Sequence, residues 1–163
     1  MVGRHVRVLL VDASRDEREM YAEWFKLKGY CTLQASTGRD GFRLASELRP
    51  DVVITAIRLP GDMDGLSLTA VLKRDPETRD LPVIVLTGCA FQHERDGASR
   101  SGCDRFVMKP CLPHVLAAVV DRVLREHRRS SRTLALRGEV ECRQQNGAVL
   151  RGSLPRESRR GRN

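Results

Sequence analysis

Three polar side chains stand at the ends of short apolar runs in this chain, where side chains from different segments can meet. They are Asp12, Thr87 and Lys109, which supply a carboxylate, a hydroxyl and an ammonium group. The ammonium and the hydroxyl suit an oxyanion such as a phosphoryl group, and the carboxylate suits a hard cation such as Mg²⁺. The three residues therefore form a candidate pocket for anion or metal chemistry, provided that the fold brings them together.

The elements that must position these residues alternate along the first 127 residues. Short apolar runs predict strands, and apolar residues three and four apart predict helices. The expected strands are 6–11, 30–35, 52–57, 83–87 and 105–109, and the expected helices are 15–28, 38–48, 66–74, 93–101 and 113–128. This alternation predicts an α/β fold, a doubly wound five-stranded parallel sheet of flavodoxin-like order 2-1-3-4-5 with helices on both faces. In such sheets the residues that follow the strands converge at one edge.

The net charge of the chain is concentrated at its C-terminal end. The 163 residues carry a formal charge of +8. Residues 1–127 hold 19 Lys and Arg against 18 Asp and Glu, whereas residues 128–163 hold ten Arg against three Glu. This composition predicts a nearly neutral domain over 1–127 and an Arg-rich, disordered tail over 128–163. It argues against a basic nucleic-acid-binding domain that includes the whole chain.

The apolar runs and the cysteines indicate a cytoplasmic protein without a membrane partner. The longest apolar runs have about six residues, whereas a membrane-spanning helix needs about 20. The five cysteines are odd in number and include no Cys-x-x-Cys pair. We therefore expect reduced thiols and no structural zinc site.

Five sequence stretches, in this order and spacing, give the first 127 residues a family resemblance. They are VLLVD at 8–12, PDVVITAIRLPG at 50–61, MDGL at 63–66, PVIVLTG at 82–88 and FVMKP at 106–110. The chain thereby resembles a response-regulator receiver domain of the CheY-like type. In that family an aspartate after the third strand takes a phosphoryl group from a kinase histidine, and two acidic residues help to hold Mg²⁺. The resemblance assigns four positions: the first acid is Asp12, the switch hydroxyl Thr87, the phosphoryl-binding lysine Lys109 and the switch aromatic Phe106.

Two positions depart from the family pattern, and both belong to the phosphorylation site. Alanine occupies the phosphoacceptor position, Ala56, and the position of the second acid, Ala13. Alanine has no oxygen that could attack a phosphoryl group, so acyl phosphate cannot form at position 56. Mg²⁺ keeps only Asp12 and, at most, the backbone carbonyl of Arg58, which makes a weak site. We therefore expect no cofactor, with Asp12 as a weak and unoccupied Mg²⁺ ligand.

The residues that remain in this degenerate pocket have simple structural interpretations. Lys109 is expected to form a salt bridge with Asp12, its only acidic partner in the pattern. Thr87 is expected to satisfy a backbone group, and Phe106 to pack in the core. The resemblance also implies a cis peptide bond between Lys109 and Pro110.

Neighbouring polar residues offer no replacement for the missing acceptor. Thr55 precedes Ala56 and should point to the opposite face of the strand, because successive side chains of a strand alternate. Asp62 and Asp64 lie in the following loop, where turn formation or helix capping is the favoured role.

The sequence therefore predicts a stand-alone receiver-like module that is not an enzyme and acts by protein–protein interaction without Asp phosphorylation. Contact would use the face of helix 93–101, strand 105–109 and helix 113–128, or the helix 15–28. The expected partners belong to two-component phosphorelay signalling, for example a histidine kinase or a phosphotransfer protein.

Three alternatives remain open at this stage. In the first, Ala13 or Ala56 is an engineered or variant replacement in a normal, phosphorylatable response regulator. In the second, the tail binds nucleic acid non-specifically through phosphates; this partner is less favoured, because no aromatic residue that could stack on bases follows Phe106. The third is a flavin-binding protein of the same topology, which the acidic loop 12–18 disfavours because it lacks glycine.

Overall fold

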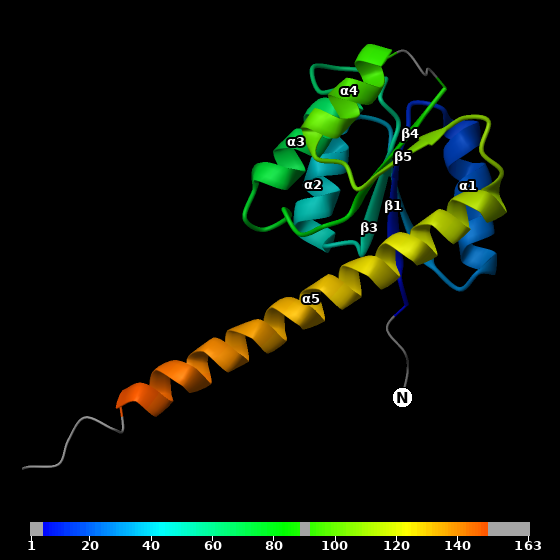
Figure 1. Ribbon diagram of the computed structural model, residues 1–163. Coiled ribbons are helices and arrows are strands. Elements are labelled where there is room, and N and C mark those ends of the chain that lie inside the picture. The colour runs from blue at the N-terminus through cyan, green and yellow to red at the C-terminus, as the bar shows by residue number, and fades with distance from the viewer. Residues whose placement is uncertain (1–4, 89–91, 150–163) are drawn as a thin grey trace, which may run out of the picture. The chain divides into compact units, whose positions relative to one another are not determined.

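Strands and helices alternate along the chain in the order that the sequence predicts (Figure 1). The computed structural model describes residues 5–88 and 92–149, and residues 134–149 by their backbone alone. In this part of the chain the strands are β1 (Arg7–Val11), β2 (Cys31–Ala35), β3 (Val52–Thr55), β4 (Val83–Thr87) and β5 (Arg105–Met108). The helices are α1 (Arg15–Leu27), α2 (Gly38–Leu48), α3 (Gly65–Arg74), α4 (Gln92–Ser101) and α5 (Pro113–Val149). Apart from the end of α5, all bounds lie within two residues of the expected ones.

The strands form one parallel sheet of order β2-β1-β3-β4-β5, which confirms the predicted fold class. The register aligns Val11 at the end of β1 with Ala35 of β2 and Thr55 of β3. Likewise, Thr87 at the end of β4 lies beside Met108 of β5. The carboxyl ends of the strands therefore share one edge of the sheet, and the segments that follow them carry the predicted pocket residues.

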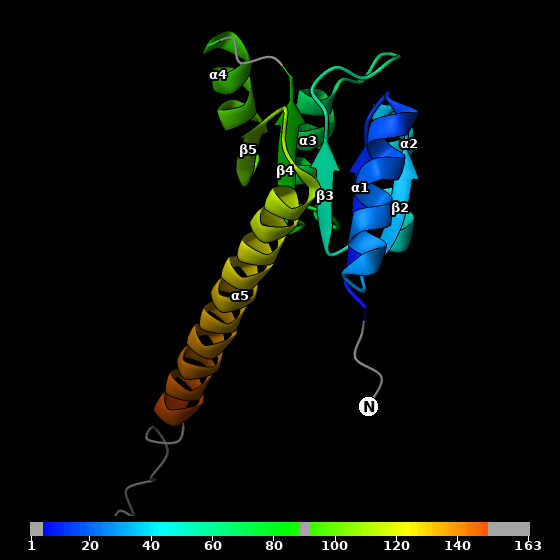
Figure 2. The ribbon, with the colours of Figure 1, turned by 90° about the vertical axis from the view of Figure 1, so that its right-hand side faces the viewer.

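Two apolar layers hold the sheet between its helices. In β1, Val8 and Leu10 pack in the layer that includes α1 and α5, whereas Leu9 and Val11 pack in the layer that includes α2 and α3. The assignment alternates because successive side chains of a strand point to opposite faces. Figures 1 and 2 show α1 and the start of α5 on one face of the sheet, with α2 and α3 on the other. Burial on both faces explains why β1 is an unbroken apolar run.

Helix α5 is longer than expected. The sequence predicts that it ends near Arg128 and is followed by a disordered tail, whereas the helix continues to Val149. The prediction of disorder is therefore wrong for residues 128–149, which are helical. Composition alone neglects that a helix whose first turns are fixed by packing does not have to be nucleated again where it continues. Residues 150–163 of the predicted tail lie outside the described residues.

The chain divides into two units, Met1–Glu126 and His127–Asn163. The first unit contains the sheet, α1 to α4 and the start of α5, and it contains all the predicted pocket residues. The described part of the second unit is the remainder of α5. None of the helices in the described ranges is long and apolar enough to cross a membrane.

Candidate functional site

The candidate site begins at the end of β1, where Asp12 leads into α1. Ser14 is the N-cap of α1, and its hydroxyl accepts a hydrogen bond from the Glu17 backbone N–H at 3.3 Å. The Ser14 N–H donates to Asp12 Oδ1 at 2.9 Å. In a full capping box the Glu17 side chain would accept from this N–H. Because Asp12 already does so, the Glu17 carboxylate is available for another partner.

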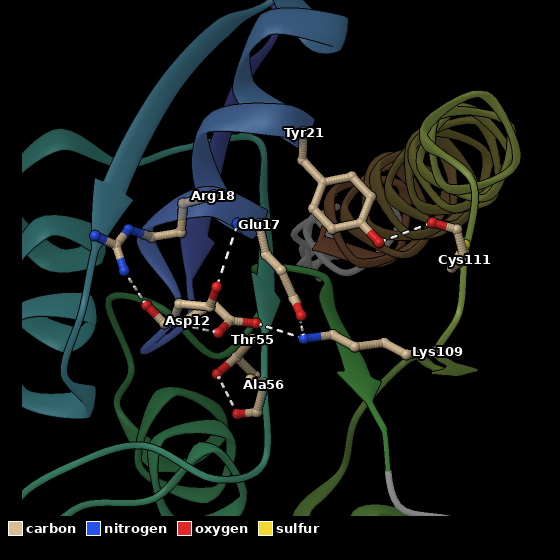
Figure 3. Close-up of polar contacts among 9 residues, drawn as sticks. Asp12, Glu17, Arg18, Tyr21, Thr55, Ala56, Lys109 and Cys111 are labelled. Carbon is tan, nitrogen blue, oxygen red and sulfur yellow. Dashed lines mark hydrogen bonds and ion pairs between the residues drawn. The ribbon is translucent and has the colours of Figure 1, made fainter.

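Glu17 and Asp12 share the ammonium group of Lys109 (Figure 3). Lys109 Nζ lies 2.8 Å from Asp12 Oδ2 and also donates to Glu17 Oε2. The side chains of Lys109, Asp12 and Glu17 are 19%, 16% and 39% exposed. We call this arrangement the Lys109 clamp, because one ammonium joins the residue after β5 to the end of β1 and the first turn of α1.

The Lys109 clamp confirms one expectation and corrects another. The salt bridge between Lys109 and Asp12 is present, but Asp12 is not the only acidic partner. Burial lowers the pKa of Lys109, but hydrogen bonds and Coulombic attraction from Asp12 and Glu17 outweigh this effect and leave the pKa above its ordinary value. The ammonium therefore remains protonated at neutral pH, with two carboxylates beside it.

A small cavity of about 150 Å³ adjoins the Lys109 clamp. The residues that line it follow β1, β3 and β5 or lie at the end of β4, namely Asp12, Ala56, Ile57, Arg58, Leu86, Thr87, Gly88 and Lys109. The fold thus brings together four of the five predicted pocket residues. The fifth, Ala13, is exposed and lies outside the lining. Since Ala56 ends in a methyl group, its part of the wall offers neither a nucleophile nor a metal ligand.

The two threonines near the cavity have different roles. Thr55 Oγ1 donates to the carbonyl oxygen of Ala56 at 3.0 Å and lies beside Gly65, away from the cavity, as strand alternation predicts (Figure 3). Thr87 is buried, and its carbonyl oxygen accepts a hydrogen bond from the Lys109 N–H at 2.8 Å. The Lys109–Pro110 peptide bond is cis, as the resemblance implies.

The donor set around the cavity does not fit Mg²⁺, an ion that requires several oxygen ligands and concentrated negative charge. Both carboxylate oxygens of Asp12 are engaged, one by the Ser14 N–H and the other by Lys109. Ala13 and Ala56 supply no side-chain oxygen, and the nearby ammonium offsets the negative charge that would attract the ion. Among the described residues, no three His, Cys, Asp or Glu side chains form a group that could hold a metal ion.

A second set of contacts joins α1 to the segment between β5 and α5. The Tyr21 hydroxyl donates to the carbonyl oxygen of Cys111 at 2.8 Å (Figure 3). Burial, more than any nearby charge, raises the pKa of Tyr21, so the phenol keeps the proton that it donates. Further along α1, the rings of Trp24 and His114 meet at a centroid distance of 6.3 Å. Together with the Lys109 clamp, these contacts fix α1 against the start of α5.

The two aspartates after β3 have structural roles. Asp64 is the N-cap of α3 and accepts a hydrogen bond from the Ser67 N–H at 2.7 Å, which confirms the capping role. Asp62 is exposed and forms an ion pair with Arg39. That pair holds the pKa of Asp62 below its ordinary value, chiefly through the hydrogen bond from Arg39.

Phe106 does not pack in the core as expected. It is half-buried and lines an open groove of about 500 Å³ between α4 and β5. The part of α4 that lines this groove contributes Arg95, Ala98 and Ser99. Side chains of this kind are too small or too polar to cover an aromatic ring, which explains the difference from the prediction.

Glu17 and Tyr21 were not anticipated as members of this site. The pattern Ser-x-x-Glu assigns Glu17 to a local capping bond, which hides its long-range role. Ala13 precedes the N-cap Ser14, so helical spacing does not relate it to Glu17, and the local sequence carries no separate signal for this role. Tyr21 lies four residues further along the same face of α1, towards the same segment after β5.

The sheet order, the convergence of Asp12, Thr87 and Lys109 at its edge and the cis bond define a receiver-type α/β signalling domain. The family model of the response regulator receiver domain matches residues 8–121. The chain therefore belongs to the response regulator receiver family.

Individual relatives agree with this membership. The polar-differentiation response regulator DivK of Brucella anthropi is 31% identical over 103 residues, which are 63% of this chain and 83% of DivK. The signal receiver domain of a signal transduction histidine kinase from Syntrophus aciditrophicus is 34% identical, with a TM-score of 0.70 over 74% of this chain and 91% of that domain. The receiver domain of a sensor histidine kinase from Pseudomonas aeruginosa, solved with a magnesium ion in its active site cleft, is 25% identical, with a TM-score of 0.68 over 74% and 98% of the two chains.

Proposed function

We propose that the protein is a receiver-like module of two-component signalling that works by protein–protein interaction, without Asp phosphorylation and without an enzymatic reaction of its own. The observation that carries the proposal is the Lys109 clamp next to Ala56. It replaces the reactive features of a phosphoacceptor site by an internal set of ion pairs.

Phosphoryl transfer to this cavity would need a nucleophilic oxygen, a cation to balance the transferred charge and a lysine free to bind the phosphoryl group. Ala56 supplies no oxygen, and the donor set around Asp12 does not fit Mg²⁺. Lys109 is already paired with two carboxylates, which would compete with a phosphoryl group for its ammonium. These three deficits together support a module that is not switched by phosphorylation.

The same contacts support a particular interaction surface. They fix α1 against the start of α5, and exposed apolar side chains flank this junction. Met20 of α1 is 45% exposed, and Leu112 and Val115 are 61% and 44% exposed. We call Met20, Leu112 and Val115 the α1–α5 surface. Exposed apolar residues on a fixed helix suit the apolar stripe of a helical partner, such as the histidine-bearing domain of a kinase or a phosphotransfer protein.

Small-molecule phosphorylation tests the first half of the proposal. The purified full chain is incubated with acetyl phosphate and Mg²⁺, and acyl phosphate is detected by intact mass and by its lability to hydroxylamine. We expect no labelled product. Stoichiometric, hydroxylamine-labile phosphate on the unaltered chain would contradict the proposal.

The double variant Ala13→Asp/Ala56→Asp is the matched control, because it restores both missing carboxylates. Labelling of this variant shows that the assay detects a competent site. The alternative of a phosphorylatable response regulator that has lost its acids by substitution also requires this labelling. The codons at positions 13 and 56 of the natural gene separate that alternative from the proposal, since only the alternative requires aspartate there.

Calorimetry with a purified phosphotransfer protein of the same organism tests the second half. The affinity should be the same with and without acetyl phosphate. Met20→Glu and Leu112→Glu should each weaken binding about tenfold or more, because a charge would replace an apolar contact at the interface. Leu48→Glu is the control, since Leu48 is 39% exposed but lies on α2, on the other face of the sheet. Equal losses in all three variants would contradict the choice of surface.

A further inference from the structure

We propose that α5 beyond Glu126 carries a binding site for the phosphate backbone of double-stranded nucleic acid. The site consists of Arg128, Arg129 and Arg132 in the second unit. All three side chains are exposed to solvent, where a ligand can reach them.

The helix gives the three arginines a spacing that suits a duplex. Arg128 and Arg132 are one turn apart, and the segment 128–132 rises about 6 Å along the helix axis. A duplex carries one phosphate per about 1.7 Å of its axis when both strands are counted, so the same length holds about three to four phosphates, about two on each strand. Guanidinium groups bind phosphate oxygens through paired N–H donors, which favours this ligand over a single diffuse anion.

The isolated helix turn is electrostatically unfavourable. Like charges at positions i and i+4, here Arg128 and Arg132, destabilise a helix. Residues 128–133 are all exposed, so no packing on the described protein offsets this repulsion. Bound phosphates would place negative charge beside the arginines, and the attraction between the two would offset this repulsion. Because the arginines already stand on a helix, binding would order fewer backbone dihedrals than it would in a disordered arm.

The composition of the second unit favours nucleic acid over a membrane surface. Residues 128–163 contain ten Arg and three Glu but no Phe, Tyr or Trp. Helices that lie on membranes combine cationic residues with large apolar and aromatic ones. The absence of aromatic side chains also predicts binding through phosphates, without base stacking or sequence preference. This inference concerns a different part of the chain from the α1–α5 surface and does not depend on it.

The test is fluorescence anisotropy of the full chain with a labelled, random-sequence DNA duplex, at several salt concentrations between about 50 and 200 mM. The variant Arg128→Gln/Arg129→Gln/Arg132→Gln removes the site, and glutamine retains a high helix propensity. If each arginine contacts one phosphate, the slope of log K against log salt should fall in magnitude by about 2.7. Affinity at the lowest salt should fall about tenfold or more.

The matched control is Arg15→Gln/Arg39→Gln/Arg43→Gln, which removes the same charge from three exposed arginines of the first unit. It should leave the salt slope unchanged, and circular dichroism should show the same helix content for both variants. Equal losses in the two variants would mean that only net charge matters, and would overturn the proposal. Absence of binding at the lowest salt, or tighter binding to vesicles that contain phosphatidylserine than to DNA, would overturn it as well.

Discussion

Replacement of Glu17 by glutamine isolates the charge that Glu17 contributes to the Lys109 clamp, because the side chain keeps its size. Hydrogen bonds to buried charged groups contribute about 1.5–3 kcal/mol, whereas exposed ion pairs contribute about 0.2–1 kcal/mol. Glu17 is 39% exposed and its partner Lys109 only 19%, so the pair lies between these limits. We expect Glu17→Gln to lower the free energy of unfolding by about 1 kcal/mol.

Lys109→Met should cost more, about 2 kcal/mol, because it leaves Asp12 and Glu17 facing each other without the ammonium. The double variant Glu17→Gln/Lys109→Met closes a thermodynamic cycle. The coupling energy between the two substitutions should be about 1 kcal/mol. The cycle cancels the separate interaction of Glu17 with the N-terminus of α1, because that interaction is lost with and without Lys109.

Urea unfolding followed by fluorescence is the assay, and Trp24 is the single tryptophan of the chain. Glu23→Gln is the matched control on an exposed position of the same helix, and its effect should lie within about 0.5 kcal/mol. A coupling energy below about 0.3 kcal/mol, or equal effects of the two glutamate substitutions, would refute the reasoning.

The Lys109 clamp also sets a pH dependence. The folded-state pKa of Lys109 is raised, so its stabilisation is fully present below the unfolded pKa of about 10.5 and is lost as the pH rises through the folded value. Urea unfolding at a series of alkaline pH values should therefore show this loss in the unaltered chain and not in Lys109→Met, which lacks the titrating group.

Four further substitutions test other parts of the site. Tyr21→Phe should lower the free energy of unfolding by about 1 kcal/mol, measured by urea unfolding, because it removes the part-buried hydrogen bond to the Cys111 carbonyl oxygen. Gly65→Ala should prevent soluble folding, measured by expression and circular dichroism, because its Cβ would overlap the Ala56 carbonyl oxygen. Asp64→Ala should cost about 1 kcal/mol by loss of the α3 N-cap, whereas Asp62→Ala, which removes an exposed ion pair, should cost about 0.5 kcal/mol or less.

The fold could be predicted because local signals and burial agree. Strand β4, for example, is bracketed by Pro82 and Gly88, and its bounds match the expected ones. Helix α2 lies between the N-cap Thr37 and a C-cap in the left-handed region, Arg49, directly before Pro50. Such boundary residues act through their own backbone conformation or through a side-chain hydrogen bond to nearby backbone, so they can be identified without knowledge of the tertiary structure.

The candidate site could be predicted only in part. Asp12, Thr87 and Lys109 meet because they stand at strand ends, and the parallel sheet aligns those ends. The role of Glu17 depends on which acceptor satisfies the Ser14 N–H, a choice between two carboxylates that local sequence does not resolve. Long-range hydrogen bonds of this kind are decided by tertiary geometry.

Two other differences between prediction and structure concern Phe106 and the segment after Arg128. In both, the neighbouring elements of the fold decide the outcome, and local sequence does not show them. Phe106 is an apolar residue of β5, but its burial depends on how large the facing side chains of α4 are. The segment after Arg128 has the composition of a disordered tail, yet it follows directly on a helix that is already formed. Composition is therefore a poorer predictor of disorder for a segment that follows directly on a formed helix.

The Lys109 clamp has a consequence for regulation under the proposed function. Its ion pairs form whenever the chain folds, and they need no phosphodonor and no metal. The amount of competent α1–α5 surface in the cell would then equal the amount of folded protein. Control would pass from a reversible chemical switch to gene expression and proteolysis, and the response would follow the stoichiometry between this protein and its partner.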